Sequence, residues 1–231
     1  MLKAILIDIG GPLVDDHSFY ELADRVVLEL LASSGRDVPK EEYQALVQGL
    51  IARLYPNPRR AAIWHFLKPD LEGYHRAVEE LRRRRQEWKA ERLQPGALEA
   101  VAALSGRYQL ALAGNQPAAI KELLESSEVL RYFRFRLVSE EMGVAKPDPL
   151  FFQVILDSLE VGPEEAAMVG DRLDLDTFPA KLLGLLTVRV LVGPYAKQEP
   201  LTPAHEPDLE VGSLGELPQA LAELSWKEAK L

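Results

Sequence analysis

Acidic residues stand at the ends of two apolar runs, where their carboxylates could hold a metal ion. Asp8 follows the run AILI, and the run AAMVG is followed by Asp171, Asp174 and Asp176. Carboxylate oxygens grouped in this way are the ligands that Mg²⁺ prefers. A single aspartate after a strand is more often a turn residue or a helix cap. The grouping therefore carries the prediction of a cation site.

Two further polar side chains complete the candidate site. Asn115 follows the strand-like run YQLALAG, just before a helix expected from Pro117, whose first N–H groups could bind an anion. Lys146 precedes Pro147, which favours an extended backbone at the lysine. Asp148 is a suitable helix N-cap, with a proline after it in the first turn. Lys146 is thus expected just ahead of a helix N-terminus.

Alternating strands and helices must position these residues. We expect strands over 3–9, 108–114, 133–139, 166–170 and 186–192, and helices over 97–104, 117–125, 149–159 and 178–183. The C-terminal stretch PDLEVGSLGELPQALAEL reads as a strand and then a helix. Such alternation predicts an α/β fold with a mainly parallel sheet. Ligands of such sheets bind beyond the carboxyl ends of the strands, where the polar residues above are expected.

A helical region interrupts this alternation after the first strand. Apolar residues recur at three- and four-residue spacing between about Ser18 and Leu93, and we expect no strand there. A proline-punctuated stretch, YPNPRRAAIWHFLKPD, is expected to be irregular, and a long charged helix is expected from Gly73 to Leu93. The chain is therefore interpreted as an α/β core with a helical insertion.

Composition limits the classes of function. The 231 residues carry a formal net charge of −9, which argues against a nucleic-acid-binding protein. There is no cysteine, so disulfides, zinc–thiolate sites and thiol nucleophiles are excluded. No stretch approaches 18 unbroken apolar residues, and the N-terminus does not read as a signal peptide. We expect a cytoplasmic protein with no membrane partner and leave its oligomeric state open.

Four motifs, taken in their order along the chain, resemble those of the haloacid dehalogenase-like superfamily. The first motif is DIGGPL, the second AGNQ, the third VSEEMGVAKPDPLFF and the fourth MVGDRLDLDTFPAKLLG. The resemblance spans nearly the whole chain. It implies a Rossmann-like parallel-sheet core, residues 1–16 and 94–231, and an α-helical cap domain inserted after the first motif, residues 17–93.

The resemblance also implies a chemistry and roles for individual residues. It implies a Mg²⁺-dependent phosphatase, in which Asp8 is the nucleophile that forms an aspartyl-phosphate. The metal ligands would be Asp8, Asp171 and the main-chain carbonyl of Gly10. Lys146 would neutralise charge on the nucleophile and on the phosphoryl group, and Asp176 would support the metal's water shell or the lysine. Gly114 and Asn115 would contact the phosphoryl group of a small phosphorylated substrate.

Two positions depart from the family pattern. Gly10 replaces the aspartate that usually acts as general acid and base, which is worth roughly 10²–10⁴-fold in rate. Gly114 replaces a Ser or Thr hydroxyl. Three interpretations follow: a specialised phosphatase, a protein that binds Mg²⁺ and a phosphorylated ligand as a regulator, or a 2-haloacid dehalogenase. We favour the phosphatase, because dehalogenating relatives work without metal and generally lack the aspartate present here as Asp171.

The missing acid predicts a preference for leaving groups that need little protonation, such as aryl, acyl or anomeric sugar phosphates. Nearness to the first motif suggests Asp15, Asp16 or His17 as a substitute proton donor. In the helical insertion, Arg59 and Arg60 are candidates to bind the substrate's anionic or hydroxylated part.

Overall fold

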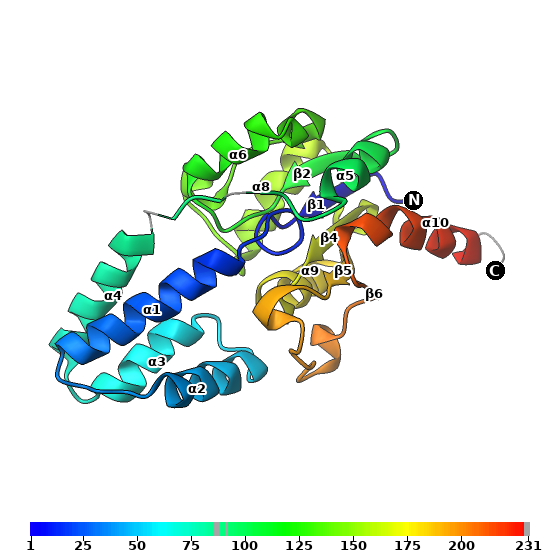
Figure 1. The fold of residues 1–231 in the computed structure, drawn as a ribbon. Helices are drawn as coiled ribbons and strands as arrows, with labels where there is room; N and C mark the ends of the chain where they lie inside the picture. Colours follow the sequence, from blue (N-terminus) through cyan, green and yellow to red (C-terminus); the bar gives the residue numbers. More distant parts are fainter. Residues whose placement is uncertain (86–87, 91, 229–231) are drawn as a thin grey trace. The chain divides into compact units, whose positions relative to one another are not determined.

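The structure is a computed structural model that describes residues 1–85, 88–90 and 92–228. The chain divides into two compact units, Met1–Asp15 with Glu91–Leu231 and Asp16–Ala90. We refer to them as the core unit and the helical unit. Both are shown as ribbons in Figure 1.

The core unit contains a six-stranded sheet in the order β3-β2-β1-β4-β5-β6, and its strand pairs are parallel. The strands are β1 Ala4–Ile7, β2 Gln109–Leu112, β3 Phe133–Phe135, β4 Ala166–Gly170, β5 Leu186–Val190 and β6 Leu209–Val211. This is the order of doubly wound nucleotide-binding folds, whose ligands bind where the strand order reverses. Here the reversal is at β1, which pairs with β2 on one side and β4 on the other. The predicted α/β fold with a Rossmann-like parallel sheet is confirmed.

Helices cover both faces of this sheet (Figure 1). They are α5 Ala97–Ser105, α6 Lys121–Ser126, α7 Ser139–Met142, α8 Pro149–Leu159, α9 Phe178–Leu183 and α10 Leu217–Glu228. Residues of α8 and α9 share an apolar cluster with Leu6 of β1 and Met168 of β4. Successive strand residues point to opposite faces, so Ile5 and Ile7 lie on the other face. Both isoleucines are fully buried, and the strands therefore read as continuous apolar runs.

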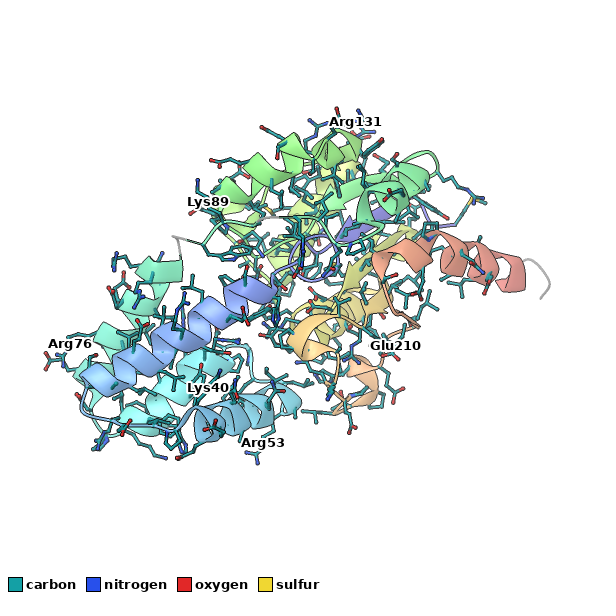
Figure 2. The ribbon with its side chains drawn as sticks, in the orientation of Figure 1. Lys40, Arg53, Arg76, Lys89, Arg131 and Glu210 are labelled. Atoms are coloured by element: carbon teal, nitrogen blue, oxygen red, sulfur yellow. The ribbon has the colours of Figure 1, made fainter. Side chains whose placement is uncertain are left out.

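The helical unit consists of α1 His17–Ser33, α2 Lys40–Ala52, α3 Pro58–Leu67 and α4 Leu71–Arg85. Each helix buries an apolar stripe, which includes Val27 of α1, Tyr43 of α2 and Ile63 of α3. Charged side chains such as Arg53 and Arg76 point outward from this unit in Figure 2. Among the helices of the described residues, none is long and apolar enough to cross a membrane.

Two expectations for the helical unit were wrong. The proline-punctuated stretch contains the regular helix α3, because Pro58 occupies its first turn, where a proline costs no hydrogen bond. The long charged helix ends at Arg85, and residues 88–90 and 92–93 are not helical. Residues 86, 87 and 91 of that expected helix lie outside the described part. Leu93 instead forms an antiparallel bridge with Val14.

Candidate active site

Asp8 lies directly beyond the carboxyl end of β1. Its N–H donates to the carbonyl of Val169 on β4 at 2.8 Å, which fixes the backbone at the point where β1 and β4 end together. The carboxylate oxygen Oδ1 accepts from the N–H of Ile9 at 2.7 Å and lies 3.0 Å from Lys146 Nζ. The carboxylate is thus held between a backbone donor and an ammonium group.

Lys146 bridges two carboxylates. Its Nζ lies 3.0 Å from Asp8 Oδ1 and 2.5 Å from Asp176 Oδ1, and its side chain is 1% exposed. Burial acts to lower the pKa of Lys146, but the charges of Asp176 and Asp8 and the hydrogen bonds to them raise it above its usual value. The lysine therefore stays protonated and supplies a fixed positive charge beside Asp8.

Asn115 binds the backbone of this lysine. Its Oδ1 accepts from Lys146 N–H and its Nδ2 donates to Lys146 O, both at 2.9 Å. This pair of bonds joins the end of β2 to the segment before α8 and fixes the position of the Lys146 backbone. The predicted contact of Asn115 with a phosphoryl group stays a prediction, and the structure adds this positioning contact, which spacing alone did not reveal.

Three buried carboxylates converge at the carboxyl ends of β1 and β4. Ligand atoms of Asp8, Asp171 and Asp176 all lie within 4.8 Å of one another, and this is the one such group of three or more among the described residues. Gly170 makes the approach possible, because a Cβ there would lie 2.3 Å from Asp176 Cγ. Burial raises the pKa of Asp8 to about 7, against the opposing effect of Lys146. A cation among these oxygens would favour the charged form.

This donor set fits Mg²⁺. The ion takes hard oxygen ligands and usually retains several waters. Asp8 and Asp171 bring carboxylate oxygens from the ends of neighbouring strands into this group, and their roles as metal ligands stay predictions. Asp176 has both oxygens engaged, one by Lys146 Nζ and the other by the N–H of Arg172 at 3.0 Å. Asp174 lies outside the cluster and pairs with Arg172. The Gly10 carbonyl stays a predicted ligand.

The space for a side chain at Gly114 is filled by Ile9. A Cβ at Gly114 would lie 2.7 Å from Ile9 Cδ1 and 2.8 Å from its Cγ1. Ile9 follows the candidate nucleophile directly and is fully buried. The hydroxyl absent from the second motif is therefore replaced by an apolar side chain from the first, a substitution across two motifs that neither motif shows by itself.

The helix start after Asn115 differs from the expectation. Residues Ala118–Ile120 form a 3₁₀ turn, and α6 begins only at Lys121. The N–H of Ala118 donates to Glu140 Oε2 at 2.7 Å. A carboxylate of the protein thus takes one of the donors that the sequence suggested for an anion.

The two candidate arginines of the helical unit have different surroundings. The buried Arg59 donates to both carboxylate oxygens of Asp24, at 2.7 and 3.1 Å, and its guanidinium lies 4.7 Å from the centroid of the Tyr20 ring. Arg60 is exposed and borders a shallow hollow of about 550 Å³. Its lining also contains Tyr55, Pro56, Asn57, Ala61, Trp64, Leu71 and Tyr74. A substrate-binding role stays a prediction for both arginines, and of the two only Arg60 lines this hollow.

Residues 2–184 match the model of the haloacid dehalogenase-like hydrolases. The chain belongs to this family. A glyceraldehyde 3-phosphate phosphatase of Methanopyrus kandleri is 42% identical to it over 94 residues, which are 41% of this chain and 40% of that one. The chain thus aligns with less than half of that relative's length. A glyceraldehyde 3-phosphate phosphatase of Pyrococcus abyssi is 30% identical over 193 residues, 81% of each chain.

The fold of this haloacid dehalogenase-like hydrolase also matches solved structures of the family. A HAD-hydrolase of Bacillus subtilis, solved bound to magnesium, superposes with a TM-score of 0.68 over 95% of this chain and 98% of that one, at 22% identity. At that identity the likeness concerns the fold. That solved structure therefore gives no information on where the acidic side chains of this chain lie.

Proposed function

We propose that this hydrolase is a Mg²⁺-dependent phosphatase that acts on small phosphorylated metabolites through an aspartyl-phosphate on Asp8. The observation that carries the proposal is the convergence of three buried carboxylates beside the buried Lys146. The names of its relatives, glyceraldehyde 3-phosphate phosphatases, support a small substrate with a phosphate monoester.

In this mechanism, Asp8 attacks phosphorus with its carboxylate, and the alkoxide or phenoxide of the substrate leaves. Lys146 balances negative charge on Asp8 and on the phosphoryl oxygens, and Asp176 and Asn115 hold the lysine in place. When bound, Mg²⁺ would offset the charge of the phosphoryl group beside the nucleophile. Water then attacks the phosphorus of the aspartyl-phosphate, the bond between phosphorus and the Asp8 oxygen breaks, and inorganic phosphate and the free Asp8 carboxylate are formed.

The proton donor for the leaving group is the open part of this mechanism. Gly10 has no side chain to supply it. Of the three nearby candidates, Asp15 accepts two hydrogen bonds from the Arg92 guanidinium, at 2.9 and 2.6 Å, and Asp16 is buried. His17 is exposed and lies 3.4 Å from Glu21. We therefore propose that the enzyme favours phosphate esters whose leaving group needs little protonation.

Phosphate release tests the proposal. The purified protein should hydrolyse p-nitrophenyl phosphate with Mg²⁺ and lose this activity with EDTA, and kcat/KM should be higher for aryl or acyl phosphates than for alkyl phosphates. Asp8→Asn should abolish turnover. Hydrolysis that survives EDTA would contradict the metal dependence, and chloride release from a 2-haloacid would indicate a dehalogenase.

The regulator interpretation predicts a different result from the same assay. It expects Mg²⁺-dependent binding of a phosphorylated ligand with no hydrolysis across the panel. Gly10→Asp then separates the alternatives further, because it restores the acid of the family pattern. A gain of activity in this variant would indicate a disabled catalyst, and a loss from an active parent would indicate that the glycine is an adaptation.

A further inference from the structure

We propose that Gln198 is a positioning residue for the acidic loop that follows β4. The acidic loop is defined here as residues 171–176, and from Leu173 it belongs to a single π-helical turn, Leu173–Thr177. The inference deepens the proposed function, because that loop carries Asp171 and Asp176 of the carboxylate cluster. The matched family region ends at residue 184, so Gln198 lies outside it.

The Gln198 side chain clamps the middle of the acidic loop. Its Oε1 accepts from the N–H of Leu173 at 3.0 Å, and its Nε2 donates to Asp174 Oδ1 at 3.2 Å. Gln198 is only 3% exposed, so water does not readily replace these bonds. The Gln198 amide therefore holds the backbone at Leu173 and the side chain of Asp174. Both residues lie between Asp171 and Asp176, the two residues of the loop that belong to the carboxylate cluster.

The clamp continues to the carboxylate cluster through Arg172. The Arg172 guanidinium donates to both oxygens of Asp174, at 3.2 and 2.5 Å, and lies 4.2 Å from the centroid of the Tyr195 ring. The N–H of the same arginine donates to Asp176 Oδ2 at 3.0 Å. Gln198 thus holds Asp174, Asp174 holds Arg172, and the backbone of Arg172 holds the carboxylate that binds Lys146.

The segment that carries Gln198 is itself anchored. Arg189 of β5 is 3% exposed and directs one guanidinium nitrogen, Nη2, at three carbonyl groups. These are the carbonyls of Tyr195, Ala196 and Gln198, at 2.9, 3.2 and 3.0 Å. A second guanidinium nitrogen, Nη1, pairs at 3.1 Å with Glu210 of β6, which is labelled in Figure 2. The turn that carries Gln198 is therefore tied to β5 by three hydrogen bonds from one buried side chain.

These contacts imply a specific effect on metal binding. The carboxylates can hold a cation only while the loop keeps Asp171 and Asp176 near Asp8. Replacing a residue that orients metal ligands in this indirect way typically weakens metal affinity 10- to 100-fold. Loss of the Gln198 amide should therefore weaken Mg²⁺ binding without removing any ligand.

The test compares Gln198→Met with the matched variant Gln109→Met. Gln109 is a partly buried glutamine of the same unit, and its amide donates to Leu159 O at 3.3 Å, away from the acidic loop. We expect Gln198→Met to raise the Kd for Mg²⁺ by about 10- to 100-fold in calorimetry. Activity should recover at saturating Mg²⁺, and Gln109→Met should leave the Kd unchanged.

Two measurements keep the inference separate from the proposed function. In the metal-free protein, the amide of Leu173 should exchange its hydrogen faster in Gln198→Met than in the wild type. Gln198→Glu keeps the acceptor for Leu173 but cannot donate to Asp174, and should also weaken Mg²⁺ binding. A wild-type Kd or unchanged Leu173 exchange in Gln198→Met would overturn the positioning role. A wild type that binds no Mg²⁺ would overturn the proposed function instead, and faster Leu173 exchange would still support the clamp.

Discussion

At the scale of single residues, Asp8 combines burial with a neighbouring ammonium, and burial has the larger effect on its pKa. The pKa is raised to about 7 in the folded protein, compared with about 3.9 in an unfolded chain. The folded state therefore binds the Asp8 proton more tightly. It follows that this residue costs the metal-free protein stability as the pH rises from about 4 to about 7, and that the cost is complete above that range.

This sign gives a prediction for Asp8→Asn. In the absence of metal, the variant should melt at a temperature at least about 3 °C above the wild type at pH 8 and close to it at pH 4.5, because it removes a buried charge. Thermal unfolding followed by circular dichroism with EDTA measures this. Asp157→Asn on the exposed surface of α8 is the control, and an Asp8→Asn variant that is no more stable at pH 8 would contradict the assignment.

The contact of Ile9 with Gly114 gives a second prediction at this scale. Gly114→Thr should destabilise the protein by about 1–3 kcal/mol, because the new side chain would overlap Ile9. Adding Ile9→Ala should cost clearly less than the sum of the two single changes, since threonine then fills part of the space that isoleucine leaves. Urea unfolding of the four proteins of this cycle gives the coupling free energy.

The control for this cycle is Ile5→Ala in β1, the strand that precedes Ile9. Ile5 is equally buried but is not among the atoms nearest to a Cβ at Gly114. Its free-energy cost should simply add to that of Gly114→Thr. Strict additivity for Ile9 as well would show that the two positions do not share space.

At the scale of secondary-structure elements, three helices of the helical unit meet at one carboxylate. Asp24 of α1 accepts from the Tyr43 hydroxyl of α2 at 2.8 Å and from the Arg59 guanidinium of α3. Burial and the charge of Asp24 raise the pKa of Tyr43 above its usual value, so the tyrosine stays a neutral donor. Asp24 therefore links all three helices through one carboxylate.

We predict that Asp24→Ala destabilises the protein by about 2–4 kcal/mol, because it removes the carboxylate that accepts hydrogen bonds from the buried Arg59 and from the Tyr43 hydroxyl. Glu29→Ala is the matched change, since it removes the more exposed ion pair with Arg84 and should cost less than about 1 kcal/mol. Chemical denaturation of both variants makes the comparison. If both variants lost the same free energy of unfolding, the buried contacts of Asp24 would stabilise the protein no more than an exposed ion pair does.

Much of the secondary structure could be predicted from the sequence, and the exceptions have physical causes. The strand AAMVG and the helix from Pro149 to Leu159 have the predicted bounds, because apolar runs and proline define their ends. The helix α3 was missed because Pro58 reads as a break in a sequence but fits the first turn of a helix. The contacts of Gln198 were missed because they join segments that share no motif.

At the scale of the whole molecule, the carboxylate cluster of Asp8, Asp171 and Asp176 lies in the core unit. Asp8 and Asp171 both follow strands of its sheet. We predict that Mg²⁺ slows amide hydrogen exchange in β1, β4 and the acidic loop and leaves α2 and α3 unchanged. The stabilisation should reach about 2.7 kcal/mol at a Mg²⁺ concentration 100 times the Kd.

Hydrogen exchange read by mass spectrometry, with and without Mg²⁺, measures this difference. Asp171→Asn should remove it, because that variant lacks one of the two predicted carboxylate ligands. A Mg²⁺ effect of equal size in α2 and α3, or one that persists in Asp171→Asn, would place the ion elsewhere.

The parallel pairing of β1 with β4 has a consequence for synthesis of the chain. Asp8 is translated well before Asp171, because more than 150 residues separate β1 from β4 and the Asp171 that follows it. Until then, the first carboxylate lacks its acidic neighbours, although Lys146 is translated before them. Nascent chains arrested before Gly170 should therefore bind no magnesium, and the ion could not guide the early steps of folding.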